Sequence, residues 1–193
     1  MRAVIISALL SLGMVGCAGD TQDKPQSDFQ VYLDPAFTAE QTADILGVLD
    51  VWTQESGGLH PLTFHYLIGY RLCDDQGGAI GGGSCWQDIT IHPSTQEDIT
   101  AMDPEHGDLL GLTRRRWSDD WLHGPHDWSN IYLATDVKQD DFRRVATHEV
   151  GHALALVHTE PGTIMCAYIT CQPENLTAAD VQQYNKLRDW TFQ

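Results

Sequence analysis

Residues 148–158 read His-Glu-Val-Gly-His-Ala-Leu-Ala-Leu-Val-His. His148 and His152 are four residues apart, a spacing that places two side chains on one face of an α-helix, with Cβ atoms about 5–6 Å apart. Two imidazoles so placed can bind one metal ion, and Glu149 between them can reach a group beside that ion. This stretch therefore predicts a helix with a metal site on one face.

His158 adds a geometric condition to this prediction. On a continuous helix it would lie about 15 Å along the axis from His148, at about 1.5 Å per residue. Bonds from zinc to imidazole nitrogen are only about 2.0–2.1 Å long, so the three rings could not meet at one ion. If His158 is the third ligand, the helix must end between His152 and His158. We expect Ala155 to lie outside the regular helix there, with positive φ.

Helix and strand patterns flank this stretch. Asp140 or Asp141 is the expected N-cap of the metal-site helix, and Thr38 and Thr177 are expected to cap an earlier and a final helix. Hydrophobic spacing indicates strands at residues 62–70, 86–92, 109–113 and 131–135. The apolar residues of 62–70 alternate onto one face, and 109–113 is expected to be an edge strand. This order indicates an α+β fold, with helices packed against a mixed sheet.

The first 17 residues resemble an export signal. Arg2 is their only charge, residues 3–15 are apolar but too few to span a bilayer, and Met14-Val15-Gly16-Cys17 resembles a bacterial lipobox with a lipidated cysteine. We expect a signal peptide at 1–17 with lipid on Cys17, a polar tether at 18–28 and one domain at 29–193. The protein would be exported and anchored in a bacterial membrane as a lipoprotein, and otherwise secreted.

Acidic residues dominate the composition. Eleven Lys and Arg residues and 27 Asp and Glu residues give a formal net charge of −16. A surface of this sign repels nucleic acids and anionic lipid headgroups. We therefore expect no nucleic-acid partner, and a membrane contact only through the N-terminal lipid.

Besides Cys17, the chain has four cysteines: Cys73, Cys85, Cys166 and Cys171. An even number in an exported protein favours disulfides over free thiols. Proximity in the sequence favours the pairs Cys73–Cys85 and Cys166–Cys171, one of three connectivities that four cysteines allow.

The histidine stretch resembles the signature of the metzincin zinc peptidases, HExxHxxGxxH followed by a turn that carries a methionine below the metal. The three histidines and Glu149 match in type and spacing, and Met165 in residues 161–165 is the candidate methionine. Ala155 stands where the family has glycine. The gap from His158 to Met165 is one residue shorter than is usual in matrixins, the branch that the chain most resembles.

The resemblance implies a small metzincin-like domain, with a twisted mixed sheet, an active-site helix and a C-terminal helix. It also implies a zinc endopeptidase, in which three histidines hold one Zn²⁺ and leave a fourth position for water. Glu149 would be the general base that takes a proton from this water as it attacks the peptide bond. The expected partner of this monomer is a peptide or protein substrate, aligned antiparallel to the edge strand.

A second, structural metal ion is also implied by weaker similarities. A weak resemblance to the structural zinc site of matrixins is found at His106, Asp108, His126 and Asp127, and Asp119 and Asp120 are candidate Ca²⁺ ligands. The alternative is that these side chains are solvated or hydrogen-bonded within the fold.

Two other interpretations remain open. In one, the chain is a non-catalytic surface lipoprotein with a structural zinc site, closed by Cys166 as a fourth ligand. In the other, a peptidase uses Glu174 in place of His158 as its third ligand.

Overall fold

A computed structural model of the chain describes residues 28–56, 62–69, 88–120 and 124–190. The predicted signal peptide with Cys17, residues 18–27 of the tether, and the pair Cys73–Cys85 lie outside these residues. None of the helices in the described ranges is both long and apolar enough to cross a membrane.

The fold is built on one five-stranded mixed sheet with the order β2-β1-β3-β5-β4. The first four strands in that order run parallel, and β4 pairs antiparallel with β5 at the edge. The strands are β1 (Asp28–Leu33), β2 (Thr63–Ile68), β3 (Asp88–Ser94), β4 (Gly111–Asp120) and β5 (Gly124–Ala134). The predicted edge strand at 109–113 is therefore present, although it begins and ends later than predicted.

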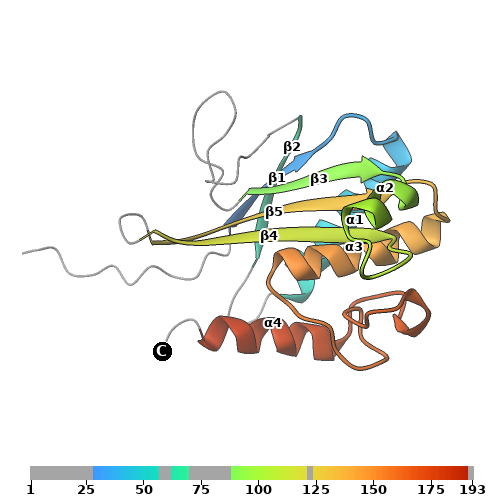
Figure 1. The fold of residues 1–193 in the computed structure, drawn as a ribbon. Helices are drawn as coiled ribbons and strands as arrows, with labels where there is room; N and C mark the ends of the chain where they lie inside the picture. Colours follow the sequence, from blue (N-terminus) through green and yellow to red (C-terminus); the bar gives the residue numbers. More distant parts are fainter. Residues whose placement is uncertain (1–27, 57–61, 70–87, 121–123, 191–193) are drawn as a thin grey trace, which may run out of the picture.

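Helices α1 (Ala39–Glu55) and α3 (Gln139–Ala153) pack against each other below one face of the sheet (Figure 1). The short helix α2 (Gln96–Met102) follows β3. The C-terminal segment lies on the far side of α3 from the sheet, and it contains the 3₁₀ turn η1 (Ile169–Cys171) and helix α4 (Ala178–Trp190). The predicted α+β class is confirmed, with a mixed sheet, a helix that carries His148 and His152, and a C-terminal helix.

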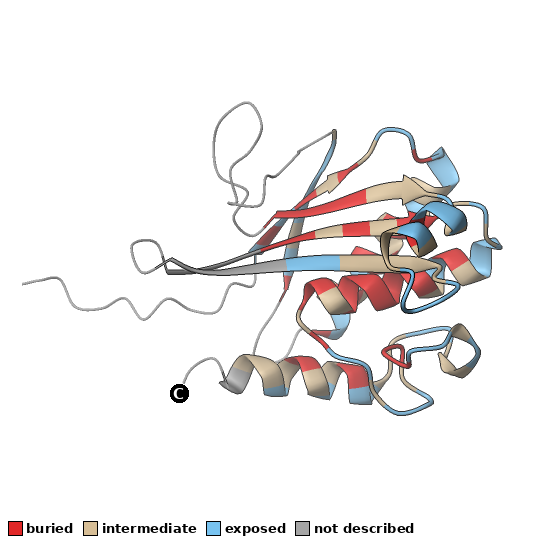
Figure 2. Ribbon diagram, in the orientation of Figure 1, coloured by how far each residue is buried: buried red, intermediate tan, exposed pale blue. Residues whose placement is uncertain are grey.

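The core fixes the position of α3. Apolar residues from the central strands and from α1 and α3 are buried together between the sheet and the helices (Figure 2). Trp52 of α1 is 1% exposed, and its indole Nε1 donates a hydrogen bond of 3.2 Å to the backbone oxygen of Thr147 in α3. Because α3 packs on both the sheet and α1, its side chains have a rigid support.

One local prediction is wrong in detail. The N-cap of α3 is Lys138, so Asp140 and Asp141 lie in the first turn instead of at the cap. Their carboxylates still face the positive end of the helix dipole. The strand predicted at residues 62–70 is present as β2, and Tyr66 and Ile68 on its apolar face are 53% and 64% exposed. This strand, β2, lies at the edge of the sheet opposite to β4.

Candidate metal centre

Helix α3 ends in a turn that sends the chain back towards its own histidines. The helix C-cap is Leu154, and Ala155 has φ of 72°. The Ala155 N–H donates to the oxygen of His152 (2.9 Å) and the Leu156 N–H to that of Gly151 (3.0 Å). These two bonds make a Schellman motif, which satisfies the last carbonyls of the helix. The prediction that Ala155 leaves the helix with positive φ is confirmed.

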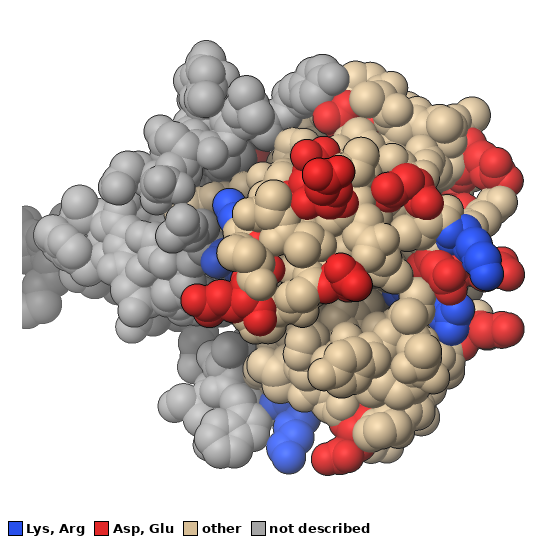
Figure 3. Space-filling view, turned by 45° about the vertical axis from the view of Figure 1, so that its right-hand side comes forward, with Lys and Arg blue, Asp and Glu red and all other residues tan. Residues whose placement is uncertain are grey.

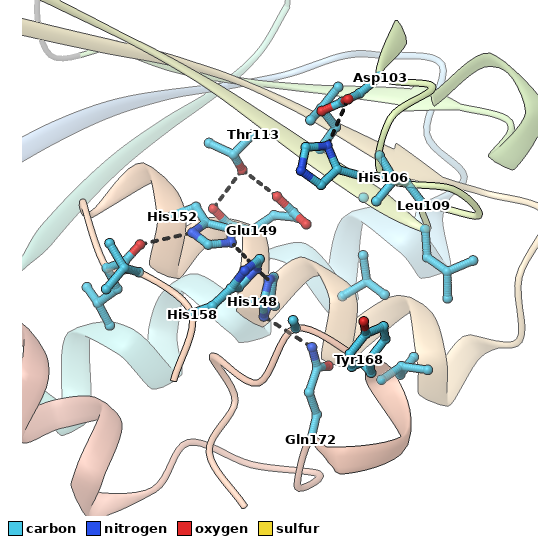
Figure 4. A pocket seen from close by; sticks show the side chains of 18 of the residues that line it. Asp103, His106, Leu109, Thr113, His148, Glu149, His152, His158, Tyr168 and Gln172 are labelled. Carbon is cyan, nitrogen blue, oxygen red and sulfur yellow. Dashed lines mark hydrogen bonds and ion pairs between the residues drawn. The ribbon is translucent and has the colours of Figure 1, made fainter. Parts of the chain in front are cut away.

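This turn brings three imidazoles together (Figure 4). The Nε2 atom of His158 lies 3.1 Å from Nε2 of His152 and 3.3 Å from Nε2 of His148. Tetrahedral zinc with bonds of about 2.0–2.1 Å places its ligand nitrogens about 3.3–3.4 Å apart. These two Nε2–Nε2 distances are therefore close to those between the ligands of one zinc ion.

The hydrogen bonds of Nδ1 in His148 and His152 also fit a bound metal ion. Nδ1 of His148 donates to the oxygen of Ile164 (2.8 Å), and Nδ1 of His152 donates to the oxygen of Leu156 (2.9 Å). A neutral imidazole with its proton on Nδ1 has a free lone pair on Nε2. Converging lone pairs repel one another unless a cation lies between them, so this donor set suits a metal ion.

Burial keeps these rings uncharged. Burial and, to a smaller extent, the neighbouring His152 lower the pKa of His148 to about 4. Burial also lowers the pKa of His152 and of His158. All three rings are therefore neutral near pH 7, which is the state that binds a metal.

Glu149 lies next to the histidines and faces strand β4. Its side chain is buried, and this burial raises its pKa to about 7, against a smaller opposite effect of the hydrogen bond from Thr113. The Thr113 hydroxyl oxygen lies 2.6 Å from Oε2 of Glu149 and 3.0 Å from its backbone oxygen. A carboxyl group with a pKa near neutrality can both accept and release a proton there.

Met165 packs against α3 where the helix has no side chain. A Cβ atom at Gly151 would overlap the Met165 sulfur, so glycine is needed for this close approach. Met165 is fully buried. Its backbone belongs to the same turn as Ile164, whose oxygen holds His148.

Asp180 of α4 anchors this turn from the other side. Its buried carboxylate accepts hydrogen bonds from the backbone N–H groups of Ile164 (3.1 Å) and Met165 (3.4 Å). It also accepts bonds from the N–H (2.9 Å) and hydroxyl (2.7 Å) groups of Thr177, whose predicted role as the cap of the last helix is confirmed by its bond to the Asp180 N–H. One carboxylate thus connects the C-terminal helix to the turn that contains Ile164 and Met165, the methionine turn.

A pocket of about 660 Å³ opens onto the three histidines and Glu149. Residues 108–113, in β4 and the loop before it, line one side, and residues 167–170 line the other. His106 lies on the β4 side, where its Nδ1 atom is 2.9 Å from Oδ1 of Asp103 (Figure 4). The pocket therefore offers a ligand both a strand edge and side-chain contacts.

The described residues favour the three histidines over the competing ligand sets. Cys166 is joined to Cys171 in a disulfide, as predicted, and so has no thiolate to close the metal site. Glu174 is not in the metal-binding cluster, which contains His158. In the described ranges, no other group of three His, Cys, Asp or Glu side chains is close enough to hold a metal, and His106 and Asp108 belong to no such group. The side chains of Asp119, Asp120, His126 and Asp127 lie outside what the structure describes.

Acidic side chains outnumber basic ones on the face shown in Figure 3, in line with the net charge of −16.

A helix with two histidines and a glutamate, a turn that returns a third histidine, and a buried methionine next to them together define a metzincin-like site. The family model of the matrixins matches residues 105–188, the segment that carries all of these features. This match supports the metzincin-like family predicted from the sequence, and it implies a metallopeptidase of the hydrolase class. No curated protein that was compared with the chain matches it.

Thr113 and Asp180 contact the site but are absent from the sequence predictions. Thr113 lies in the predicted edge strand, but strand pairing does not reveal which helix residue it faces. Thr177 and Asp180 have the spacing of an N-terminal cap, yet only the tertiary fold brings the methionine turn to the same carboxylate.

Proposed function

We propose that the chain is a zinc-dependent endopeptidase with His148, His152 and His158 as metal ligands and Glu149 as general base. The observation that carries this proposal is the convergence of three uncharged imidazoles beside a buried carboxyl group in an open pocket. Bound zinc would polarise the scissile carbonyl and lower the pKa of a water molecule. Glu149 would accept a proton from the attacking water and transfer it to the leaving amine.

The peptide substrate would extend the sheet. Strand β4 is an edge strand, antiparallel to β5, and its residues 111–113 line the pocket. A peptide in extended conformation could pair with the free edge of β4 and place its side chains in alternate subsites. We propose that the protein acts in this way as a monomer on peptides or proteins, without a nucleic-acid partner.

The test compares two single substitutions, Glu149→Gln and His152→Ala. Glu149→Gln keeps the size and hydrogen bonding of the side chain but removes the base, so peptidase activity should fall by about 100-fold or more with zinc still bound. His152→Ala should lose zinc, since two imidazoles hold the ion weakly. Zinc content, circular dichroism and cleavage of a broad library of end-blocked peptides would be measured for each protein.

Two outcomes would argue against this function. Wild-type rates in the Gln variant would remove Glu149 from the mechanism. A wild-type protein with one zinc ion but no cleavage of any peptide would favour the non-catalytic surface lipoprotein instead.

We further propose that the enzyme is exported and held at a membrane by lipid on Cys17. The support is the lipobox-like sequence at residues 14–17. Replacement Cys17→Ser should release or misprocess the protein, and mass spectrometry of the mature N-terminus from native membranes checks this. A mature N-terminus downstream of Cys17 would contradict the anchor.

A further inference from the structure

Strand β4 lies beside the carboxyl group of Glu149. Gly111 and Thr113 are two residues apart, so they lie on the same face of the strand. The Thr113 hydroxyl oxygen is 2.6 Å from Oε2, and a Cβ atom at Gly111 would be only 2.7 Å from Oε1. Oε2 therefore accepts a hydrogen bond, and Oε1 lies next to space that a side chain at residue 111 would fill.

The Thr113 hydroxyl has one proton and two acceptors within reach. A length of 2.6 Å is typical of a charge-assisted O–H···O⁻ bond, whereas the contact to the Glu149 backbone oxygen is longer, at 3.0 Å. The proton therefore points to Oε2 when Glu149 is ionised. Within the described part of the chain, Thr113 provides the side-chain hydrogen bond that fixes this long, rotatable group.

We propose that Thr113 is a positioning residue, whose hydroxyl holds Oε2 of Glu149 and so leaves Oε1 to accept the catalytic proton. In the step concerned, a water O–H bond breaks as its oxygen bonds to the carbonyl carbon, and the proton moves to Oε1. The proton then passes to the amide nitrogen as the C–N bond breaks. Thr113 itself gains and loses no proton. This inference rests on the proposed peptidase function.

The strand to which a substrate would add is thus also the strand that orients the base. Residues 111–113 form one side of the pocket, and Gly111 packs on α3 at Val145 and Glu149. Small shifts of β4 would change the position of the carboxyl group, and a misplacement of about 1 Å can cost about 100-fold in rate.

The experiment compares Thr113→Val with Thr113→Ser. Valine keeps the branched shape but lacks the hydroxyl, so kcat should fall by about 10- to 100-fold with KM and zinc content nearly unchanged. Serine keeps the hydroxyl and should restore most of kcat. The matched control is Thr135→Val, which removes a hydroxyl bonded to the Ser94 oxygen (3.1 Å) outside the pocket and should leave kcat unchanged.

A second measurement does not depend on activity. Crystal structures of the two zinc-free variants should show the Glu149 carboxyl group displaced or in several conformers in Thr113→Val, and in its original position in Thr113→Ser. Equal rates in wild type and Thr113→Val, an equal loss in the serine variant, or loss of zinc or of folding in Thr113→Val would each overturn the proposal. Absence of zinc-dependent cleavage by the wild type would instead contradict the proposed function, and the crystal structures would still test the contact.

Discussion

Helix α3 and the segment after it both carry residues of the candidate metal site, but these residues are held in place in different ways. Within α3, the regular spacing of the helix is sufficient to bring His148 and His152 to one face. After Leu154, the positions of His158 and Met165 depend on a turn and on hydrogen bonds from distant residues. A substitution in the helix should therefore affect only the group that it removes. Loss of a hydrogen bond that holds the segment after the turn should lower stability and zinc affinity together.

The largest effect is expected for Asp180→Ala, which removes the anchor of the methionine turn. The variant leaves buried N–H groups of Ile164 and Met165 without acceptors, at about 1–3 kcal/mol each. We expect the free energy of unfolding to fall by about 3 kcal/mol or more. Zinc affinity should fall by about 10- to 100-fold, because the Ile164 oxygen orients His148. Chemical denaturation and zinc competition titrations measure both quantities.

The matched control lies on α3. Asp141 forms a partly exposed ion pair with Arg144 on the helix surface, and Asp141→Asn should cost less than about 1 kcal/mol without a change in zinc affinity. If Asp180→Ala behaved like this control, the turn would not depend on Asp180, and the contrast between the two regions would fail.

The pH dependence of the unfolding free energy tests two buried residues of α3, Glu149 and His148. In the chelated protein, the raised pKa of Glu149 contributes stability that is complete below about pH 4.5 and is lost as the pH rises through about 7. His148, with its pKa lowered to about 4, has the opposite effect: its contribution is complete above about pH 6.5 and is lost as the pH falls towards 4. In wild type, Glu149 and His148 therefore change the unfolding free energy with pH in opposite directions.

Glu149→Gln removes only the loss of stability with rising pH that Glu149 causes. From pH 4 to pH 8, the chelated variant should therefore gain up to about 3 kcal/mol in unfolding free energy relative to wild type, the equivalent of a pKa raised from 4.5 to about 7. Urea denaturation at several pH values measures this gain. Parallel curves for the two proteins would show that the Glu149 carboxyl group is not buried as described.

A smaller effect is expected for the disulfide in the C-terminal segment. Cys166–Cys171 closes a short loop whose residues 167–170 line the pocket. Replacing both cysteines with serine should lower the free energy of unfolding by about 2 kcal/mol, the estimate for so short a loop. Thermal unfolding under oxidising and reducing conditions checks this, since reduction should destabilise wild type more than the variant. A wild type that is insensitive to reductant would contradict a role of the bridge in stability.

The same contrast explains what could be predicted from the sequence. Helical spacing and zinc bond lengths together required a break before His158, and the structure has it at Ala155. Strand patterns indicated the mixed sheet but missed β1 and helix α2, and the alternation at residues 62–70 did not show that Tyr66 and Ile68 of β2 are exposed. An edge strand and an interior strand can share the same alternation, because burial is decided by neighbours that are distant in sequence.

The contacts of Thr113 and Asp180 could not be predicted for a related reason. Each depends on the register between two elements: Thr113 on how β4 lies over α3, and Asp180 on how α4 docks against the methionine turn. Local patterns fix which residues form an element but not which residues of another element they meet. The three candidate ligands could be predicted from the sequence because a shared metal ion would impose one distance on all of them.

The smallest expected effect concerns the turn itself and is tested by Ala155→Gly. Left-handed geometry costs a non-glycine residue about 1–2 kcal/mol, and Ala155 has φ of 72°. Glycine removes this strain but adds freedom to the unfolded chain, which costs about 0.4–1 kcal/mol. The variant should therefore be up to about 1 kcal/mol more stable than wild type, with unchanged zinc affinity.

The control Ala43→Gly, at an exposed position inside α1, should be about 1 kcal/mol less stable, because glycine lowers helix propensity there. Denaturation curves of the two variants should thus move in opposite directions from wild type. If both moved down together, Ala155 would have ordinary helical geometry, and His158 could not reach the other two histidines.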